Sequence, residues 1–180
     1  MPRIATLVID MLNPYDHEDA DALASEAESR IEPLLRLVDA TRSHPDAELV
    51  YVNDNHGDFT ATSADLAERA LAGRRPELIE PILPPADTPF LQKVRHSAFY
   101  NSALDHMLNE NDVEVVVLSG QVTEQCILYT ALDAYIRGFE VRVADDAVVP
   151  IETELGDAAL KMMAHNMQTH LAPSDEVLDA

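Results

Sequence analysis

The chain has 180 residues and carries 33 aspartates and glutamates against 12 lysines and arginines, a formal charge of −21. This acidity argues against nucleic-acid binding, which needs a basic face, and against binding to anionic membrane surfaces. The single cysteine excludes an internal disulfide framework and any zinc site built from several thiolates.

Length and hydropathy predict one domain over residues 1–180. A chain of this size buries roughly 70% of its unfolded surface, which is enough for a sizeable core. No apolar run approaches the ~20 residues that a membrane span requires, and the first residues lack the cleavage site of a signal peptide. We therefore expect a cytoplasmic protein. The acidic ending, residues 173–180, is expected to be loosely ordered.

Short apolar runs alternate along the chain with longer segments of helical periodicity. In chain order, we predict a strand at 4–9, a helix at about 20–40, a strand at 49–52, a helix at 63–71, a proline-rich surface loop at 74–89, a strand at 90–94, a helix at 99–109, a strand at 113–118, a helix from 123 to about 137, a strand at 141–144, a helix at 153–167 and a possible edge strand at 169–172. Strands that are apolar throughout are typical of a parallel sheet with both faces covered. The pattern predicts a three-layer α/β/α Rossmann-like fold with a mainly parallel sheet of about five to six strands.

Polar residues follow several of the predicted strands. They are Asp10, Asn53, Asp54, Lys93, Arg95, the turn 119–126 and Asp145. In open parallel sheets, ligands bind beyond the carboxyl ends of the strands, where the strand order reverses. An acid, a lysine and a thiol are therefore expected to meet at one edge of the sheet.

Cys126 lies at the start of a predicted helix. Thr123 is a suitable N-cap, which places Cys126 in the first turn, near the positive end of the helix dipole. Such a position lowers the pKa of a thiol below its free value of about 8.5 and favours a nucleophile. The alternative is that this residue is a small buried hydrophobe without a chemical role.

Asp10 ends an apolar central strand, where a charge needs a partner unless it caps the following turn. Lys93 is a candidate partner, and it is one of only two lysines in a chain that otherwise uses arginine. A compact ammonium fits between two anions more easily than a planar guanidinium does. A surface charge near an edge strand explains Lys93 equally well.

Three sequence blocks resemble the isochorismatase-like cysteine hydrolases, a superfamily that includes nicotinamidases, N-carbamoylsarcosine amidohydrolases and ureidoacrylate amidohydrolases. The blocks are TLVIDM (6–11), KVRHSAF (93–99) and GQVTEQC (120–126), the last followed by TALDA (130–134). They occur in the order and at the spacing of the family, and the resemblance extends over about residues 4–172.

The resemblance implies a catalytic set of Asp10, Lys93 and Cys126. It also implies a cis peptide bond between Gln121 and Val122, which aims the backbone N–H groups of Val122 and Cys126 at an oxyanion. In the implied mechanism Asp10 accepts the thiol proton, Lys93 stabilises the thiolate, and the sulfur attacks a carbonyl carbon. Ammonia or an amine leaves, water hydrolyses the thioester, and no cofactor takes part.

The sequence departs from the family pattern at two places. Leu12 stands where many members carry glutamine two residues after the aspartate. Asp54 and His56 match the first pair of ligands of the nicotinamidase metal site, but no third ligand is evident, and catalytic zinc needs three protein ligands. We therefore expect no metal and interpret His56 as a loop residue near the mouth of the pocket.

The predicted function is hydrolysis of a C–N bond (amide, carbamoyl or ureido) in a small molecule. Candidate substrate contacts are Tyr15, Asn53, His56, His96, Phe99 and Tyr129, and the aromatic ones suit core or oligomer contacts equally well. The excess of acids disfavours polyanions such as isochorismate, so we expect a neutral amide.

Two alternative functions stay open at this point. One is an isochorismatase-type vinyl ether hydrolase, an activity whose enzymes lack the nucleophilic thiol. The other is a catalytically silent member of the family that acts as a binding or assembly module. Family members usually form dimers or tetramers, so the resemblance also implies a homo-oligomer.

Overall fold

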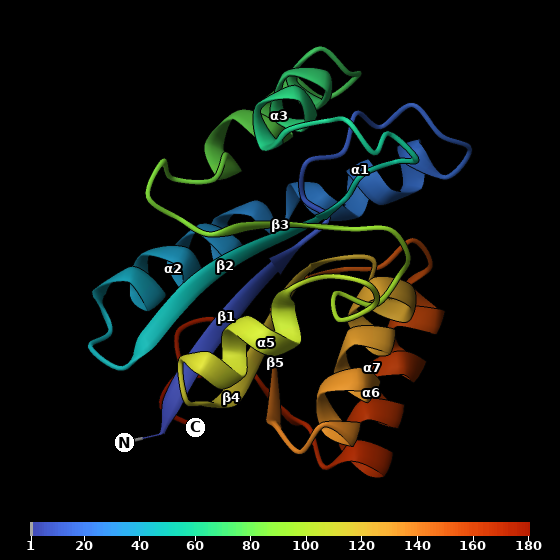
Figure 1. Ribbon diagram of the computed structural model, residues 1–180. Helices are drawn as coiled ribbons and strands as arrows, with labels where there is room; N and C mark the ends of the chain where they lie inside the picture. The colour runs from blue at the N-terminus through green and yellow to red at the C-terminus, as the bar shows by residue number, and fades with distance from the viewer. Residues whose placement is uncertain (1) are drawn as a thin grey trace.

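The strands form one parallel sheet in the computed structural model, which describes residues 2–180 (Figure 1). The strands are β1 (Arg3–Ile9), β2 (Ala47–Asp54), β3 (Phe90–Lys93), β4 (Val113–Gln121), β5 (Glu140–Val149) and β6 (His170–Ala172). Their order in the sheet is β3-β2-β1-β4-β5-β6, and each neighbouring pair is parallel. The predicted α/β fold with a parallel sheet is confirmed.

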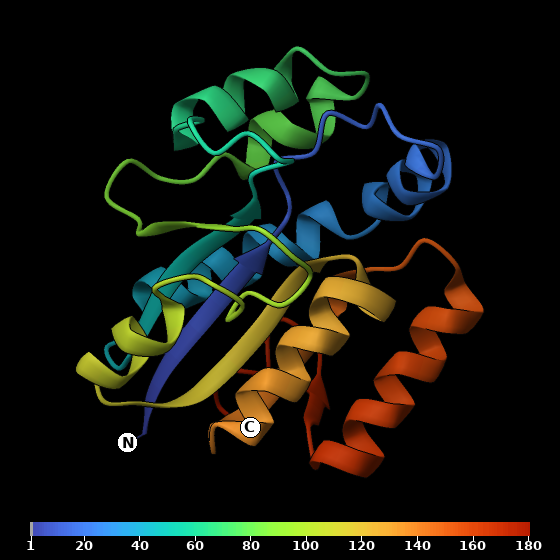
Figure 2. The same ribbon diagram turned by 45° about the vertical axis from the view of Figure 1, so that its right-hand side comes forward.

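Helices cover both faces of the sheet. They are α1 (Ala20–Glu28), α2 (Ile31–Ser43), α3 (Ser63–Leu71), α4 (Pro76–Ile79), α5 (Leu104–Glu110), α6 (Leu128–Ile136) and α7 (Thr153–Met167). Apolar side chains of α5, α6 and α7 pack on one face, and those of α2 pack on the other. Figure 1 shows α5 in front of β1 and α2 behind β2, and Figure 2 shows the same layers after a turn. Within residues 2–180, no helix is both long and apolar enough to cross a bilayer.

β1 lies between β2 and β4 and is buried from its second residue onward. Leu7 faces the core under α5 to α7, and Val8 faces the core under α2. Thr6 is the polar exception, and its hydroxyl lies 2.9 Å from the hydroxyl of Thr41 on α2. A strand covered on both sides needs a continuous apolar run, which explains why the sequence shows no alternation here.

Three predicted elements differ from the structure. The predicted helix 20–40 is divided into α1 and α2, because α2 packs on the sheet whereas α1 packs with α3 and α4 beyond its edge. The proline-rich segment 74–89 contains α4 and a 3₁₀ turn (Glu80–Ile82) with buried apolar side chains. Proline is compatible with the first turn of a helix, so it does not exclude one here. The predicted helix 99–109 begins only with α5, after a series of turns.

The C-terminal segment is packed against the sheet, and the prediction of a loosely ordered ending is wrong. Val177 is 0% exposed and Leu178 is 8% exposed. Arg142 of β5 donates hydrogen bonds to the backbone carbonyls of both residues, at 3.1 and 2.9 Å. Two apolar residues in an acidic segment are too few to form a periodic pattern, so the sequence does not predict this contact.

The strand order reverses between β1 and β4. From β1 the chain proceeds to β2 and β3 on one side, and from β4 it proceeds to β5 and β6 on the other. The carboxyl ends of these two central strands therefore point to an edge where the crossover segments diverge, the usual location of ligands in such sheets.

Gly120 allows β1 and β4 to lie side by side at this edge. It pairs with Ile9 of β1, and its φ is +102°, a conformation that L residues with side chains rarely adopt. A Cβ atom at this position would collide with the backbone carbonyl of Ile9. The position therefore requires glycine for both space and conformation.

We expect Gly120→Ala to lower the free energy of unfolding by roughly 3 kcal/mol or more, because overpacking and backbone strain act together. Urea unfolding followed by circular dichroism measures the loss. Gly138→Ala is the matched control, since Gly138 has φ +89° but no atom within 4 Å of the added Cβ. In Gly138→Ala, backbone strain alone is expected to lower the free energy of unfolding, by about 1 kcal/mol. Equal losses in the two variants would contradict the close-approach argument.

Candidate active site

Asp10 follows β1 with a positive φ of 54°, which turns the chain out of the sheet. Its Oδ2 atom lies 2.8 Å from Lys93 Nζ, and its Oδ1 atom accepts a 2.7 Å hydrogen bond from the backbone N–H of Asp54. Its backbone carbonyl accepts a 2.7 Å hydrogen bond from Gln121 Nε2. The ends of β2, β3 and β4 thus hold this residue from three directions.

Lys93 is the last residue of β3, and its side chain is 1% exposed. Its Nζ atom lies 2.8 Å from Asp10 Oδ2, 3.5 Å from Asp54 Oδ2 and 3.1 Å from the backbone carbonyl oxygen of Arg95. Cys126 Sγ lies 3.6 Å away. Burial alone favours the neutral amine, but the surrounding negative groups outweigh it and raise the pKa of Lys93. The side chain therefore stays an ammonium.

Cys126 lies in a wide turn of π-helical hydrogen bonding (Thr123–Ile127) that precedes α6. In this turn, the backbone N–H of Ile127 donates to the carbonyl of Val122, at 3.1 Å. The predicted N-cap is wrong. Val122 occupies that position, and the buried hydroxyl of Thr123 has no hydrogen-bond partner among residues 2–180. Turns of this kind are frequent at functional sites.

The thiol of Cys126 has a raised pKa, contrary to the expectation from the helix start. Burial raises the pKa to about 12, and the negative charge of Asp10 adds to the effect. The positive charge of Lys93 and the backbone of Val122 lower it by less. Desolvation therefore outweighs the helix terminus. The resting sulfur is a protonated thiol at neutral pH, close enough to the Asp10 carboxylate for that charge to raise its pKa.

A cleft of about 610 Å³ lies between the segments that follow β2 and β3. Its lining includes Asp54, His56, Phe59, Arg95, His96 and Tyr100. The Nδ1 atom of His96 lies 3.9 Å from Cys126 Sγ, so one wall of the cleft lies beside the thiol. The ring of Tyr129 on α6 packs 5.4 Å from the ring of His96. Figures 1 and 2 show the segment before α5 beside the turn that precedes α6.

Three of the proposed substrate contacts lie beneath the site and do not line this cleft. Tyr15 is 1% exposed, and its hydroxyl donates to Gln121 Oε1 at 3.4 Å. Asn53 is 2% exposed and accepts a 2.9 Å hydrogen bond from the backbone N–H of Leu12. Phe99 is stacked on Phe139 in the core. These side chains support the loops of the site from below, because protein groups already occupy their polar atoms and faces.

Other residues of the site carried weak signals or none. The sequence indicates Asp54 as a polar residue that follows a strand and as half of a possible metal pair, and in the structure it pairs in register with Lys93 across β2 and β3. An acid and a lysine at the ends of two neighbouring strands form a pattern that predicts such a contact. Phe59 and Tyr100 line the cleft from irregular segments, where no periodic pattern marks them. The Gln121–Val122 peptide bond is cis in the structure.

Asp54 and His56 do not fit the role of metal ligands. Asp54 Oδ1 accepts a 2.7 Å hydrogen bond from the backbone N–H of His56, and Oδ2 faces the Lys93 ammonium. A cation at this carboxylate would be repelled by that ammonium. In the part of the chain that the structure describes, residues 2–180, no group of three or more His, Cys, Asp or Glu residues is arranged to hold a metal.

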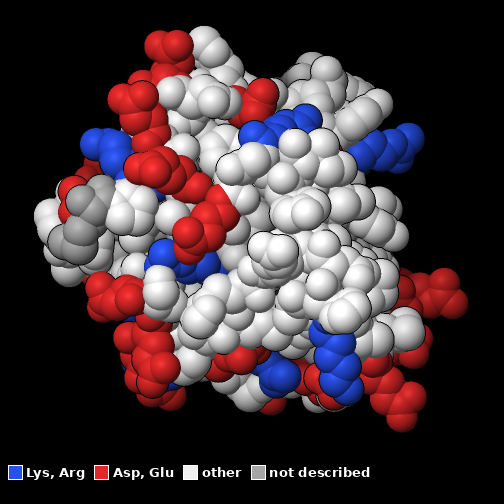
Figure 3. Space-filling view, turned by 90° about the horizontal axis from the view of Figure 1, so that it is seen from below, with Lys and Arg blue, Asp and Glu red and all other residues white. Residues whose placement is uncertain are grey.

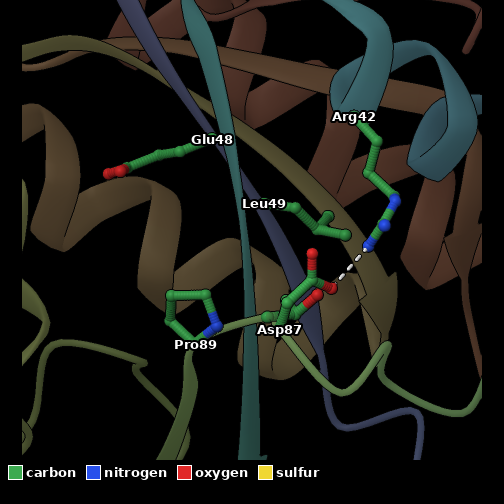
Figure 4. A pocket seen from close by; sticks show the side chains of 6 residues that line it. Arg42, Glu48, Leu49, Asp87 and Pro89 are labelled. Atoms are coloured by element: carbon green, nitrogen blue, oxygen red, sulfur yellow. Dashed lines mark hydrogen bonds and ion pairs between the residues drawn. The ribbon is translucent and has the colours of Figure 1, made fainter.

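A second hollow, of about 290 Å³, lies at the opposite edge of the sheet, where β2 begins (Figure 4). Arg42 and Asp87 form a 3.1 Å ion pair across it, and Figure 4 shows Glu48 pointing away from this pair. Its lining holds no thiol, histidine or lysine. This hollow therefore lacks the reactive side chains that lie at the carboxyl ends of the strands.

Comparison with known proteins agrees with this fold. A model of the Isochorismatase domain matches residues 5–175. The chain is 27% identical to the isochorismatase family protein YaaI of Bacillus subtilis, over 97% of this chain and 96% of that protein. An isochorismatase-like hydrolase from Alkaliphilus metalliredigens has a similar structure, with a TM-score of 0.80, 27% identity and 98% of each chain covered. N-carbamoylsarcosine amidase from Thermoplasma acidophilum is also similar, with a TM-score of 0.75, 27% identity, and 97% of this chain and 98% of that chain covered.

The chain belongs to the isochorismatase family. Its relatives are hydrolases that include amidohydrolases.

We expect Asp10→Asn to accelerate alkylation of Cys126 by iodoacetamide at pH 8 by about tenfold, because removal of the carboxylate charge lowers the pKa of the thiol. Mass spectrometry of the alkylated protein between pH 7 and 11 measures the rate. Asp39→Asn, at an exposed position of α2, removes the same charge on the other face of the sheet and is expected to leave the rate unchanged. Slower alkylation of Asp10→Asn would contradict the contribution of Asp10 to the thiol pKa.

We expect the purified protein, prepared without chelators, to contain well below one equivalent of zinc or iron. The reason is that both oxygens of Asp54 are engaged by protein donors. Elemental analysis by mass spectrometry measures the metal content. One tightly bound equivalent per chain would overturn this interpretation of Asp54 and His56.

Proposed function

We propose that this protein is a cysteine hydrolase that cleaves a C–N bond of amide, carbamoyl or ureido type in a small molecule. The observation that carries the proposal is the position of the Cys126 sulfur. It lies 3.6 Å from a buried ammonium, that of Lys93, which is itself paired at 2.8 Å with the carboxylate of Asp10. A nucleophile, a base and a fixed positive charge are the groups that covalent hydrolysis requires.

Proton transfer from the thiol to Asp10 begins the reaction. The proton moves from a neutral group to an anion, so the total charge of the site stays the same. Lys93 contacts both partners and therefore stabilises the charge wherever it resides. This arrangement makes a thiolate at the moment of attack without a low resting pKa.

Attack of the sulfur on the carbonyl carbon forms a C–S bond and places a negative charge on the oxygen. In this proposal, that oxyanion accepts hydrogen bonds from the backbone N–H groups of Val122 and Cys126. Val122 directly precedes the turn that holds Cys126, so both N–H groups belong to the segment that carries the sulfur.

Collapse of the tetrahedral intermediate breaks the C–N bond and leaves a thioester. The departing nitrogen takes the proton from Asp10. Water then attacks the thioester carbon while Asp10 accepts a proton from it. The C–S bond breaks, and Asp10 returns the proton to the departing sulfur, which regenerates the thiol and the carboxylate. The products are ammonia or an amine and the acid.

We expect Cys126→Ala and Cys126→Ser to abolish turnover, by at least about 10³-fold, because the nucleophile is lost. An ammonia-release screen over amides, carbamates and ureido compounds measures activity. The circular dichroism spectrum, expected to be unchanged, verifies the fold. Mass spectrometry of the acid-quenched wild-type enzyme tests for an acyl adduct on Cys126.

Full hydrolytic activity in Cys126→Ala would contradict the covalent mechanism. Vinyl ether hydrolysis that survives this substitution would favour the isochorismatase-type activity. A wild-type thiol that releases nothing from any of these compounds would favour a binding module.

A further inference from the structure

Arginines in this protein are nearly all neutralised by the chain itself. Eight of the ten have a guanidinium nitrogen within 4.0 Å of a carboxylate: Arg30, Arg36, Arg42, Arg69, Arg74, Arg75, Arg137 and Arg142. Figure 3 shows this on one face of the molecule, where several blue groups lie against red ones. Among residues 2–180, Arg3 and Arg95 have no such partner. In a chain with 33 acids, an arginine without a carboxylate is the exception.

Arg95 lies directly at the active site. Its backbone carbonyl accepts the 3.1 Å hydrogen bond from Lys93 Nζ, and the next residue, His96, has its Nδ1 atom 3.9 Å from Cys126 Sγ. The Arg95 side chain is exposed and belongs to the lining of the cleft. Its backbone is therefore part of the catalytic framework, while its guanidinium group is free to meet a ligand.

The local charge of the cleft differs in sign from that of the whole protein. Asp54 is the one acid in its lining, and its carboxylate is engaged by the Lys93 ammonium at 3.5 Å and by the N–H of His56. Among the residues that line the cleft, Arg95 is therefore the one with a fixed charge that no group of opposite charge engages. It attracts an anion, and its planar fork of N–H donors matches the two oxygens of a carboxylate.

We propose that Arg95 binds a carboxylate of the substrate, and that the substrate is a small C–N compound carrying one carboxylate group besides its scissile carbonyl. This inference rests on the proposed function and specifies its substrate class. It replaces the neutral amide expected from the net charge of −21, because that total is spread over surface groups that arginines partly neutralise. The cleft itself presents an unmatched cation.

Two alkylating reagents test the proposal without a known substrate. Iodoacetate and iodoacetamide react in the same way: the thiolate of Cys126 forms an S–C bond to the CH₂ carbon, and iodide leaves. They differ only in that one carries a carboxylate and the other a neutral amide. Each alkylation rate at Cys126 is divided by the rate of the same reagent with free cysteine. The ratio of the two normalised rates, iodoacetate over iodoacetamide, does not depend on how slowly the thiol reacts.

We expect iodoacetate to exceed iodoacetamide in this ratio by about tenfold in the wild type, as one charge-assisted bidentate contact allows. Arg95→Met is expected to remove this advantage, because only the carboxylate contact distinguishes the two reagents. Loss of the positive charge also raises the pKa of the thiol and slows both reagents alike, which cancels in the ratio. Arg95→Lys, which keeps the charge but not the fork, is expected to give an intermediate ratio. The backbone contact of Arg95 with Lys93 is retained in both variants.

Arg3→Met is the matched control. Arg3 is also unpaired and exposed, but it begins β1 at the opposite edge of the sheet, so its loss changes the net charge equally and is expected to leave both rates unchanged. An iodoacetate ratio no higher than that of iodoacetamide in the wild type would overturn the proposal. An iodoacetate advantage that persists in Arg95→Met, or that Arg3→Met removes equally, would do the same.

The outcome is separable from that of the proposed function. If no compound of the ammonia-release screen is hydrolysed while the Arg95-dependent preference for iodoacetate is present, the hydrolase proposal fails and the carboxylate site stands. If amides are hydrolysed, each active acid is compared with its methyl ester. In the wild type, the KM of the ester is expected to be about tenfold higher than that of the acid. In Arg95→Met, the KM of the ester is expected to be the same as in the wild type. Equal KM values for acid and ester in the wild type would count against the carboxylate site while leaving the hydrolase intact.

Discussion

The ion pair between Lys93 and Asp10 is the constraint on which the rest of the site depends. A buried ammonium costs several kcal/mol unless anions and hydrogen-bond acceptors surround it. Here the carboxylates of Asp10 and Asp54 and the carbonyl of Arg95 supply that environment. Their positions follow from strand register, because Asp54 pairs with Lys93 across β2 and β3. A shift of one residue would turn Lys93 to the other face of the sheet, so sheet pairing and catalytic geometry are one requirement.

The thiol shows why a local rule fails inside a folded protein. The start of a helix favours a thiolate, but Cys126 is 7% exposed and next to the carboxylate of Asp10, and both effects favour the thiol. The result is a nucleophile that stays protonated until its base acts. Such a thiol is less open to oxidation and to stray electrophiles than a permanent thiolate, since the thiolate is the reactive form.

Sequence patterns predicted helices and strands whose apolar residues recur at regular spacing within one element. α7 has the predicted bounds, and the apolar runs of β1 and β4 identified the central strands. The convergence of Asp10, Lys93 and Cys126 followed from the rule that ligands gather beyond strand ends. The pattern did not distinguish residues that line the cleft from those beneath it, as Tyr15 shows. That distinction depends on contacts across the fold, as do the burial of the C-terminal segment and the pairing of most arginines.

β3 has four residues, lies at the edge of the sheet and pairs only with β2, yet it carries the buried ammonium of the candidate site. Edge elements with few partners open locally at a lower free energy than the whole domain unfolds. Opening of β3 would separate the Lys93 ammonium from the carboxylates of Asp10 and Asp54, which stabilise it in the fold. The site can therefore come apart through its shortest strand while the core of β1 and β4 stays folded.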